Sequence, residues 1–495
     1  MRKTWAGIGL GLTSGLVALG AGELVAGVLP ETRSPVIDVG DRVIDLVPPA
    51  VKDFAIEVFG TADKLILLIG IGLVIAVLAS LLGTVALRRP RAAMLGFGGF
   101  GFLGAGAALA GGGGVVVVIP SLVAGVAGAG TLDYLARRST SESTGRRRFL
   151  VLAGGMAVGA IAAGLGGRLL RSVLAGAGPA GPLPRPDQAL SPHPAGADLE
   201  IPGLASFVTP NETFYRIDTA LDIPRLSIPN YQLLIGGMVA HPLKLTFEDI
   251  VSRPLVEADI TLSCVSNEIG GKLVGNARWL GIRLDDLLAE AGIDPAADQI
   301  VGRSADAYTC GFPVATLDGR NSLLAIGMNG EPLPLEHGFP VRLVVPGLYG
   351  YVSATKWLTE IELTTFAAFD QYWVPRGYSA QAPIKTQSRI DTPKPLARIL
   401  AGPTTIAGVA WAQTRGIEMV EVRIDEQDWQ VAELGAAVND TTWRQWKISW
   451  AATPGRHSLT VRATDGTGEI QTEERTRPAP DGATGWHSVV VLVDG

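Results

Sequence analysis

Long apolar runs dominate the first 175 residues of the chain, whereas later positions mostly alternate between apolar and polar side chains. Five of these runs span or nearly span a bilayer, which takes a helix of ~20 residues. They lie at roughly residues 5–29, 65–87, 92–110, 114–136 and 149–167. This pattern predicts an all-α transmembrane domain of five helices over residues 1–175. The third and fourth runs are rich in Gly and Ala, which favours a tightly packed hairpin around Gly111–Gly114.

The charges between the runs predict an orientation. The loop 30–63 carries seven acidic residues. Basic residues occur instead before the first run and in the second and fourth connections: Arg2, Lys3, Arg88, Arg89, Arg91, Arg137, Arg138, Arg146, Arg147 and Arg148. Because cytoplasmic flanks collect Lys and Arg, we expect a multi-pass plasma-membrane protein with a cytoplasmic N-terminus and everything after about residue 175 outside the cytoplasm. The alternative is that the first or fifth run is a buried helix of a soluble fold.

The run Gly145-Arg-Arg-Arg-Phe-Leu150 has a second interpretation. Two arginines, a spacer and Phe-Leu before an apolar run resemble a twin-arginine (Tat-like) export signal, which moves folded proteins. The alternative is a plain positive-inside stop. A domain that receives its cofactor in the cytoplasm would need the folded-protein route.

Three further regions follow the apolar part. Residues 176–200 are rich in Pro and predict an extended, solvated linker, in which His193 is only a linker residue. Residues 201–385 mix strand patterns, such as 231–238, with a helix at 284–291 that Gly292 ends, so an α+β domain is expected. Residues 386–495 alternate throughout and predict an immunoglobulin-like β-sandwich.

The composition excludes some functions. The net charge of −6 gives no reason to expect a nucleic-acid partner. Five scattered His and two Cys without a Cys-x-x-Cys pair do not supply four zinc ligands. On the residues alone, Cys264 is a buried structural thiol, a disulfide partner of Cys310, or a metal ligand or nucleophile.

The neighbours of Cys264 resemble the sulfite oxidase family of molybdopterin-dependent oxidoreductases, in a membrane-anchored bacterial branch. The resemblance runs from residue 207 onward and leaves residues 1–175 uncovered. Its motifs are Phe207-Val-Thr-Pro-Asn211, Cys264-Val-Ser-Asn267, Asn276-Ala-Arg-Trp-Leu-Gly281, Asn329-Gly-Glu-Pro-Leu-Pro334, His337-Gly-Phe-Pro-Val-Arg342, Val345-Pro-Gly347, Lys356-Trp-Leu358 and Trp373-Val-Pro-Arg-Gly-Tyr378.

The resemblance implies a molybdenum–molybdopterin (Mo-MPT) cofactor. It makes Cys264 the protein ligand of the metal and a catalytic residue together with Tyr378, which matches the family tyrosine beside the metal. A dianionic phosphate needs fixed cations, and Arg342 and Lys356 supply a planar fork and a point charge. The remaining cofactor-binding residues that the resemblance or its setting indicates are Asn211, Tyr215, Asn267, Asp306, His337, Gly350 and Ser353. Cys310 then stays a free, mostly buried thiol.

The chain departs from the family where the substrate binds. Sulfite oxidases carry an arginine where Pro210 stands and a second one where Glu268-Ile269 follows the cysteine loop. Sulfite is a dianion and needs such cations. Arg216, Arg303 and Arg376 are the candidates to replace them, and the substrate therefore stays open between sulfite and a sulfoxide, as in the sulfoxide-reductase branch.

We therefore expect an enzyme that moves one oxygen atom to or from a small molecule outside the cytoplasm. The apolar runs contain no His that could bind haem, so a separate electron-transfer partner, a cytochrome or a quinone-linked protein, is expected. The C-terminal domain of relatives suggests a homodimer. The competing hypotheses are a membrane-anchored binding or scaffold protein that has lost the cofactor, and a transporter with a soluble cap, which the shortage of intramembrane charges disfavours.

Overall fold

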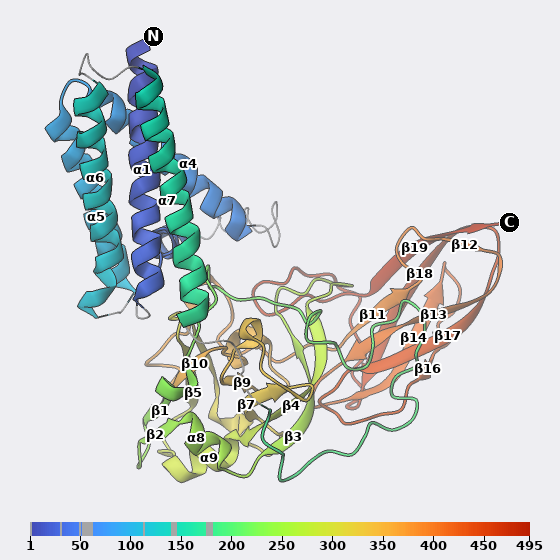
Figure 1. The fold of residues 1–495 in the computed structure, drawn as a ribbon. Helices are drawn as coiled ribbons and strands as arrows, with labels where there is room; N and C mark the ends of the chain where they lie inside the picture. Colours follow the sequence, from blue (N-terminus) through green and yellow to red (C-terminus); the bar gives the residue numbers. More distant parts are fainter. Residues whose placement is uncertain are drawn as a thin grey trace. The chain divides into compact units, whose positions relative to one another are not determined.

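The computed structural model describes residues 2–29, 32–48, 51, 63–111, 114–139, 146–174 and 182–495. The chain separates into two compact units (Figure 1). The first comprises residues 1–177 together with 220–223, and the second comprises residues 178–219 and 224–495.

The first unit is helical. Its described elements are α1 (Arg2–Val28), α2 (Pro35–Leu46), α4 (Asp63–Ala86), α5 (Pro90–Ala110), the short η2 (Val115–Val118), α6 (Ile119–Ser139) and α7 (Arg146–Leu174). Among these, α1, α4, α5, α7 and the joined η2–α6 are long and apolar enough to cross a membrane, which confirms the five predicted helices. Apolar side chains such as Leu73, Leu95 and Phe102 point outward from this unit.

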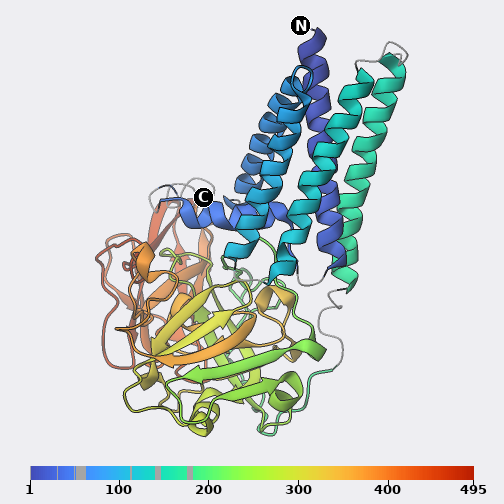
Figure 2. The same ribbon diagram turned by 90° about the vertical axis from the view of Figure 1, so that its left-hand side faces the viewer.

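Small residues let the long helices approach one another closely, as Figure 2 shows. A Cβ at Gly11 of α1 would lie 1.9 Å from the carbonyl oxygen of Ala79 in α4, and a Cβ at Gly27 would lie 2.1 Å from that of Gly167 in α7. Helices α5 and α6 pack on each other at Gly101 and Gly125, as the predicted hairpin requires. Part of its turn, residues 112–113, lies outside the described residues.

The acidic loop predicted at 30–63 contains a helix that the apolar pattern did not reveal. Helix α2 begins after Ser34, whose hydroxyl accepts a hydrogen bond from Val36 N, and Pro35 occupies its first turn. One of its carboxylates is paired locally, since Arg33 lies 2.7 Å from Asp41. An amphipathic helix of this length has too few apolar residues to appear as a run. Residues 52–62 lie outside the described part of the chain.

The central domain, residues 201–385, is built on two sheets. One has the strand order β2 (Leu243–Thr246), β1 (Gln232–Gly237), β10 (Leu358–Thr364), β5 (Gln299–Ser304), β6 (Thr309–Pro313). The other has the order β3 (Val256–Ser263), β4 (Val274–Arg283), β7 (Leu323–Met328), β8 (Glu331–Pro332), with β9 (Arg342–Val344) paired to β7. The helical pieces of this domain are η3 (Ile228–Asn230), α8 (Phe247–Val251), α9 (Leu284–Ala291), η4 (Val314–Thr316), η5 (Leu335–His337), α10 (Gly350–Ser353) and η6 (Val374–Arg376).

Local sequence explains the boundaries of two helices. Thr246 and Asp249 form a reciprocal capping box that starts α8. The predicted helix 284–291 is confirmed as α9, and it ends because Gly292 adopts a left-handed conformation with φ of 69°. The predicted strand 231–238 is confirmed as β1.

Within its described residues 182–200, the segment predicted as a solvated linker is mostly exposed and belongs to none of the named helices or strands. Asp187 exchanges two hydrogen bonds with the backbone of Leu255, each 2.8 Å long. His193 Nε2 lies 3.0 Å from Asp259 Oδ2, and the ring packs against Phe207. These contacts attach the segment beside β3, while most of its side chains stay exposed to solvent. Residues 176–181 lie outside the described part.

Two sheets make up residues 386–495 and share one apolar core. One contains β11 (Gln387–Thr392), β13 (Gly402–Trp411), β17 (Arg444–Ala452) and β16 (Glu433–Leu434). The other contains β12 (Arg398–Leu400), β19 (His487–Asp494), β18 (Gly455–Asp465), β14 (Ile417–Ile424) and β15 (Gln430–Val431). Figure 1 draws these C-terminal sheets in orange to red, beside the green and yellow strands of the central domain.

Candidate active site

A cavity opens in the central domain where β3, β5, β9 and α10 meet. Most of its wall is aromatic or charged. The lining residues are Phe214, Tyr215, Ile217, Asp218, Thr219, Leu262, Cys264, Ser304, Asp306, Tyr308, His337, Arg342, Gly350, Tyr351, Ala354, Lys356, Trp357 and Trp373. The cavity therefore brings together seven residues predicted from the sequence: Cys264, Tyr215, Asp306, His337, Arg342, Gly350 and Lys356.

Cys264 lies directly after the last residue of β3 and is buried. Its backbone N–H donates to Leu273 O at 2.9 Å, which fixes the cysteine at the base of the loop between β3 and β4. Burial raises the pKa of the thiol, whereas hydrogen bonds from Ser266 and the charge of Lys356 act to lower it. Cys264 and Cys310 are both free thiols, so the disulfide alternative is absent. Cys310 is buried and accepts a hydrogen bond from Thr355 Oγ1 at 2.7 Å.

Arg342 is a buried cation at the start of β9. Its Nη1 donates to His337 O at 2.9 Å, and its guanidinium lies 5.0 Å from the centre of the Trp279 ring. Among the residues that the structure describes, no carboxylate forms an ion pair with it. Burial lowers the pKa of Arg342 to about 10, so the group is still charged at neutral pH. A buried charge without a counter-ion is costly, which indicates that this cavity is built to hold an anion.

Lys356 provides the second cation and is already paired. Its Nζ lies 2.8 Å from Asp218 Oδ2 and donates to Glu336 O at 3.1 Å. Burial lowers the pKa of this ammonium to about 8, although Asp218 acts in the opposite direction. Asp218 was not predicted from the sequence, because the residues that it contacts come together only in the fold.

His337 is neutral at physiological pH. Burial and the nearby charge of Arg342 lower its pKa to about 4. Its Nε2 donates to Asn211 O at 3.0 Å, since a backbone carbonyl only accepts, and this leaves Nδ1 as an acceptor. The ring also meets the edge of Phe214. Next to Phe214, Tyr215 stacks on that ring at 5.2 Å, and burial raises the pKa of its phenol.

Three predicted cofactor residues lie outside the lining. The amide of Asn211 is bonded to Met328 O and to the side chains of Asn329 and Glu331. Asn267 closes the cysteine loop, because its Oδ1 accepts from Leu273 N at 2.8 Å, while its buried Nδ2 has no partner. Ser353 Oγ donates to the carbonyls of Leu348 and Tyr349, the two residues that precede α10.

Tyr378 also lies outside the lining, one layer behind it. Its ring contacts the rings of Tyr351 and Trp373, both of which line the cavity. Tyr308, which the sequence did not single out, lines the cavity as well and donates through its hydroxyl to Tyr351 O at 2.6 Å. Aromatic side chains without a motif gave no signal that would separate them from core residues.

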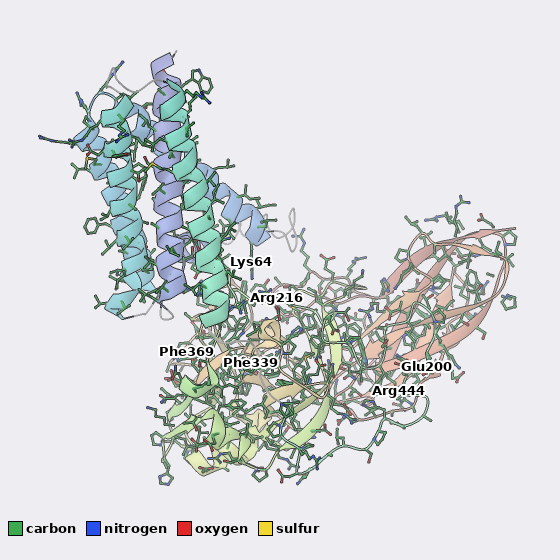
Figure 3. The ribbon with its side chains drawn as sticks, in the orientation of Figure 1. Lys64, Glu200, Arg216, Phe339, Phe369 and Arg444 are labelled. Carbon is green, nitrogen blue, oxygen red and sulfur yellow. The ribbon has the colours of Figure 1, made fainter. Side chains whose placement is uncertain are left out.

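The arginines considered as substitutes for the missing family arginines are engaged elsewhere, and none lines the cavity. Arg216, labelled in Figure 3, pairs with Asp218 at 2.8 Å. Arg303 pairs with Glu362 and stacks over Phe369, which is labelled in the same view. Arg376 lies 3.7 Å from the centre of the Tyr372 ring.

The donor set fits a metal that arrives within an organic anion. Within the described ranges, no group of three or more His, Cys, Asp or Glu residues could hold an ion by itself. One thiol, an unpaired buried guanidinium and an ammonium instead face the same space. Soft thiolate ligation suits molybdenum, and the two cations suit the phosphate and dithiolene of molybdopterin.

Comparison with known proteins agrees with this chemistry. Residues 220–373 match the oxidoreductase molybdopterin binding domain. Human mitochondrial sulfite oxidase is 30% identical over 304 residues, which cover 52% of this chain and 55% of the human protein. The uncharacterized oxidoreductase YuiH of Bacillus subtilis is 35% identical over 158 residues, or 32% of this chain and 77% of YuiH. The crystal structure of the sulfane dehydrogenase SoxCD from Paracoccus pantotrophus shares the fold, with a TM-score of 0.51 at 24% identity over 59% of this chain and 84% of that one.

Fold and site together define a molybdopterin-binding oxidoreductase. More narrowly, the chain belongs to the sulfite oxidase family of molybdenum-dependent oxidoreductases. It spans about half the length of the mitochondrial sulfite oxidases that it matches, 55% of the human protein and 50% of the one from Drosophila melanogaster.

Proposed function

We propose that this protein is a membrane-anchored molybdenum–molybdopterin oxidoreductase that transfers an oxygen atom to or from a small substrate outside the cytoplasm. The observation that carries the proposal is the placement of buried Cys264 and buried Arg342 around one cavity, the first as a metal ligand and the second as a cation without a carboxylate partner in the described chain. When bound, the cofactor supplies a metal that accepts or donates two electrons as oxygen is transferred.

The protein's own residues would bind the cofactor and orient it. Arg342 and Lys356 would hold the anionic part of the cofactor, and neutral His337 would face it with an acceptor nitrogen. Gly350 leaves room for close approach, since a Cβ there would meet its nearest neighbour, Ala354 Cβ, only at 3.6 Å. Asn211, Asn267 and Ser353 would act by shaping the backbone around the site. Tyr378 would donate a hydrogen bond or pass a proton near the metal, and its ring contacts Tyr351, which lines the cavity.

The cavity favours a neutral oxide over sulfite. Its two lining cations are the two that the cofactor requires, and Asp218 and Asp306 add negative charge to the wall. A dianionic substrate would therefore meet an anionic cofactor without a cation of its own. Tyr308, Tyr351 and Trp373 instead offer an apolar, aromatic surface that suits the alkyl groups of an S-oxide or N-oxide.

The helical unit supports the membrane assignment. The five helices are long, and the helix Lys64–Ala86 has a mean hydropathy of 3.1 with little of its surface covered. With the basic flanks inside, an odd number of crossings would put residues 182–495 outside the cytoplasm, and the Tat-like sequence before Phe149 would export that part already folded. A separate cytochrome or quinone-linked protein would exchange electrons with it. The proposal includes two further predictions from the sequence: the C-terminal sheets form an immunoglobulin-like β-sandwich, and the protein is a homodimer.

Metal analysis and a substrate comparison test the proposal. The full chain, purified from a host that makes molybdopterin, should contain about one molybdenum per chain. With a reduced viologen dye it should turn over dimethyl sulfoxide or trimethylamine N-oxide at a higher kcat/KM than it oxidises sulfite with an electron acceptor. Absence of molybdenum together with a Cys264–Cys310 disulfide would leave the scaffold hypothesis as the better one. An alkaline phosphatase reporter fused after Gly495 should be active, and one fused after Arg138 should not.

A further inference from the structure

The loop that carries Cys264 is closed by its own hydrogen bonds. This cysteine loop, residues 264–273, joins β3 to β4, and Cys264 N donates to Leu273 O at its base. Inside the loop, Asn267 Oδ1 accepts from Leu273 N at 2.8 Å, and Gly271 N donates to Glu268 O, also at 2.8 Å. A displacement of the turn at Gly271 is therefore passed to the residues that orient the thiol.

The C-terminal sheets hold the tip of this loop through an arginine. Arg389 of β11 donates through Nη1 to Gly271 O at 2.7 Å. Its guanidinium is buried and oriented by Asp391, with Nε 2.7 Å from Asp391 Oδ1. Asp391 is itself fixed by an N–H from Ala205 at 3.1 Å. The guanidinium of Arg389 is planar, so the carboxylate of Asp391 that holds its Nε also fixes the direction in which its Nη1 points toward the loop.

A histidine from the same sheets packs against Gly270, the residue before Gly271 in the turn. Gly270 has φ of 76°, and a Cβ there would lie 2.2 Å from His487 Nε2. His487 Nδ1 accepts from Ile390 N at 3.0 Å, so the neutral ring carries its proton on Nε2, the edge that faces Gly270. Burial lowers the pKa of His487 to about 4, which keeps the ring neutral.

The strand that leads into the cysteine is held in the same way. Thr261, three residues before Cys264, receives a hydrogen bond from Trp443 N at 2.7 Å and one from Gln413 Nε2 at 3.0 Å. Its own N–H donates to Thr441 O at 3.0 Å. Both the strand before the thiol and the turn after it are thus fixed by the C-terminal sheets.

We propose that Arg389 and His487 are positioning residues, through which the C-terminal sheets set the direction of the Cys264 thiolate toward the metal. The proposal rests on the proposed function, in which Cys264 is the metal ligand. A thiolate sulfur that is displaced from its metal by a fraction of an ångström would bind the metal less well. It would also change the electronic structure of the metal centre.

The first test replaces Arg389→Lys, which retains a charge beside Asp391 but loses the fork. The matched control is Arg462→Lys. Arg462 makes a similar ion pair with Glu421 at 2.7 Å in these sheets, and it forms no hydrogen bond to the cysteine loop in the part of the chain that the structure describes. In the metal-free protein, iodoacetamide should alkylate Cys264 about tenfold faster in the Arg389 variant, as expected from losing one charge-assisted hydrogen bond. Buried Cys310 serves as the internal reference. In the metal-loaded protein, kcat should fall about tenfold or more, with shifted Mo(V) EPR g-values.

A second test does not depend on the stability of the Arg389 variant. Gly270→Ala should raise the alkylation rate of Cys264 by displacing the loop from His487, and His487→Ala by itself should raise it too, because the turn then loses the ring that it packs against. Wild-type alkylation and EPR spectra in Arg389→Lys, or equal effects in Arg462→Lys, would overturn the proposal. If the wild-type protein itself contains no molybdenum, the proposed function fails, while the alkylation rates still decide whether the sheets hold the loop.

Discussion

Lys356 Nζ and Asp218 Oδ2 lie 2.8 Å apart inside the cavity, and Arg216 Nε lies 2.8 Å from the same carboxylate oxygen. The cation that the family assigns to cofactor binding thus has an internal counter-ion in this protein. Since both side chains of the Lys356–Asp218 pair are buried, their interaction is little weakened by solvent. An incoming anion must share Lys356 with Asp218.

Replacing Asp218→Asn should therefore strengthen anion binding in the cavity. The metal-free variant should bind inorganic pyrophosphate about tenfold more tightly than the metal-free wild type, because one buried negative charge is removed. Isothermal titration calorimetry measures the difference. Asp481→Asn, which removes the carboxylate paired with Lys385 in an exposed setting, should leave the affinity unchanged. Equal affinities in Asp218→Asn and wild type would show that Lys356 does not face the bound anion.

Replacing Cys264→Ser should abolish turnover while the protein still folds. Loss of a direct metal ligand should cost more than the ~10- to 100-fold that is typical of residues one layer removed. Steady-state kinetics with a reduced dye, together with the melting temperature, separates the two effects. Cys310→Ser provides the comparison, because that thiol lies outside the cavity lining. A Cys264→Ser protein with full activity would leave the thiol without a catalytic role.

Replacing Arg342→Met should stabilise the metal-free protein and prevent cofactor retention. The variant removes a buried charge that has no carboxylate partner in the described residues, and the linear Met side chain fills similar space. The free energy of unfolding of the metal-free protein should rise by about 1 kcal/mol. Denaturant unfolding and molybdenum content, measured on the same preparations, test both parts. A destabilised variant that still retained molybdenum would contradict this role of Arg342.

His337 should make the protein sensitive to acid. Its pKa is lowered from 6.5 to about 4 in the folded state, so between these values the unfolded chain binds a proton that the folded chain does not. Stability is then fully present above pH 6.5 and falls as the pH drops toward 4, by up to about 1.4 kcal/mol per pH unit.

The variant His337→Asn should accordingly show a flatter decline of unfolding free energy between pH 6.5 and 4.5. His487, whose pKa is also lowered to about 4, should give a similar change when it is replaced by Asn. Denaturant unfolding of the detergent-solubilised protein at several pH values gives the slopes. Parallel slopes for wild type and His337→Asn would mean that the histidine is protonated in the folded state.

The features that could be predicted from the sequence share one property: they repeat or cluster locally. Five apolar runs gave five helices, and Gly292 marked the end of α9. The order of motifs predicted Cys264, His337, Arg342 and Lys356 at one site, and all four line the cavity. The local sequence was sufficient to predict these residues, because each of them lies in a short motif beside a strand end or a turn.

The features that could not be predicted depend on contacts between distant residues. Asp218 has no motif, and its role follows only from the position of Lys356 in the fold. Tyr378 was expected beside the metal, and its ring contacts Tyr351 and Trp373, which line the cavity. Two contacts of the Pro-rich segment had no local signal, because Asp187 and His193 meet partners some 65 positions further along, at Leu255 and Asp259.

The bonds that Thr261 makes to Gln413, Thr441 and Trp443 have a consequence for any attempt to shorten this protein. They pair the outer edge of β3, the terminal strand of its sheet, at the end that leads into Cys264. A truncated version ending at residue 385 would expose this part of the edge, and exposed edges recruit further strands. Such a fragment should be recovered as aggregates, and the minimal soluble catalytic piece must extend to the last strand.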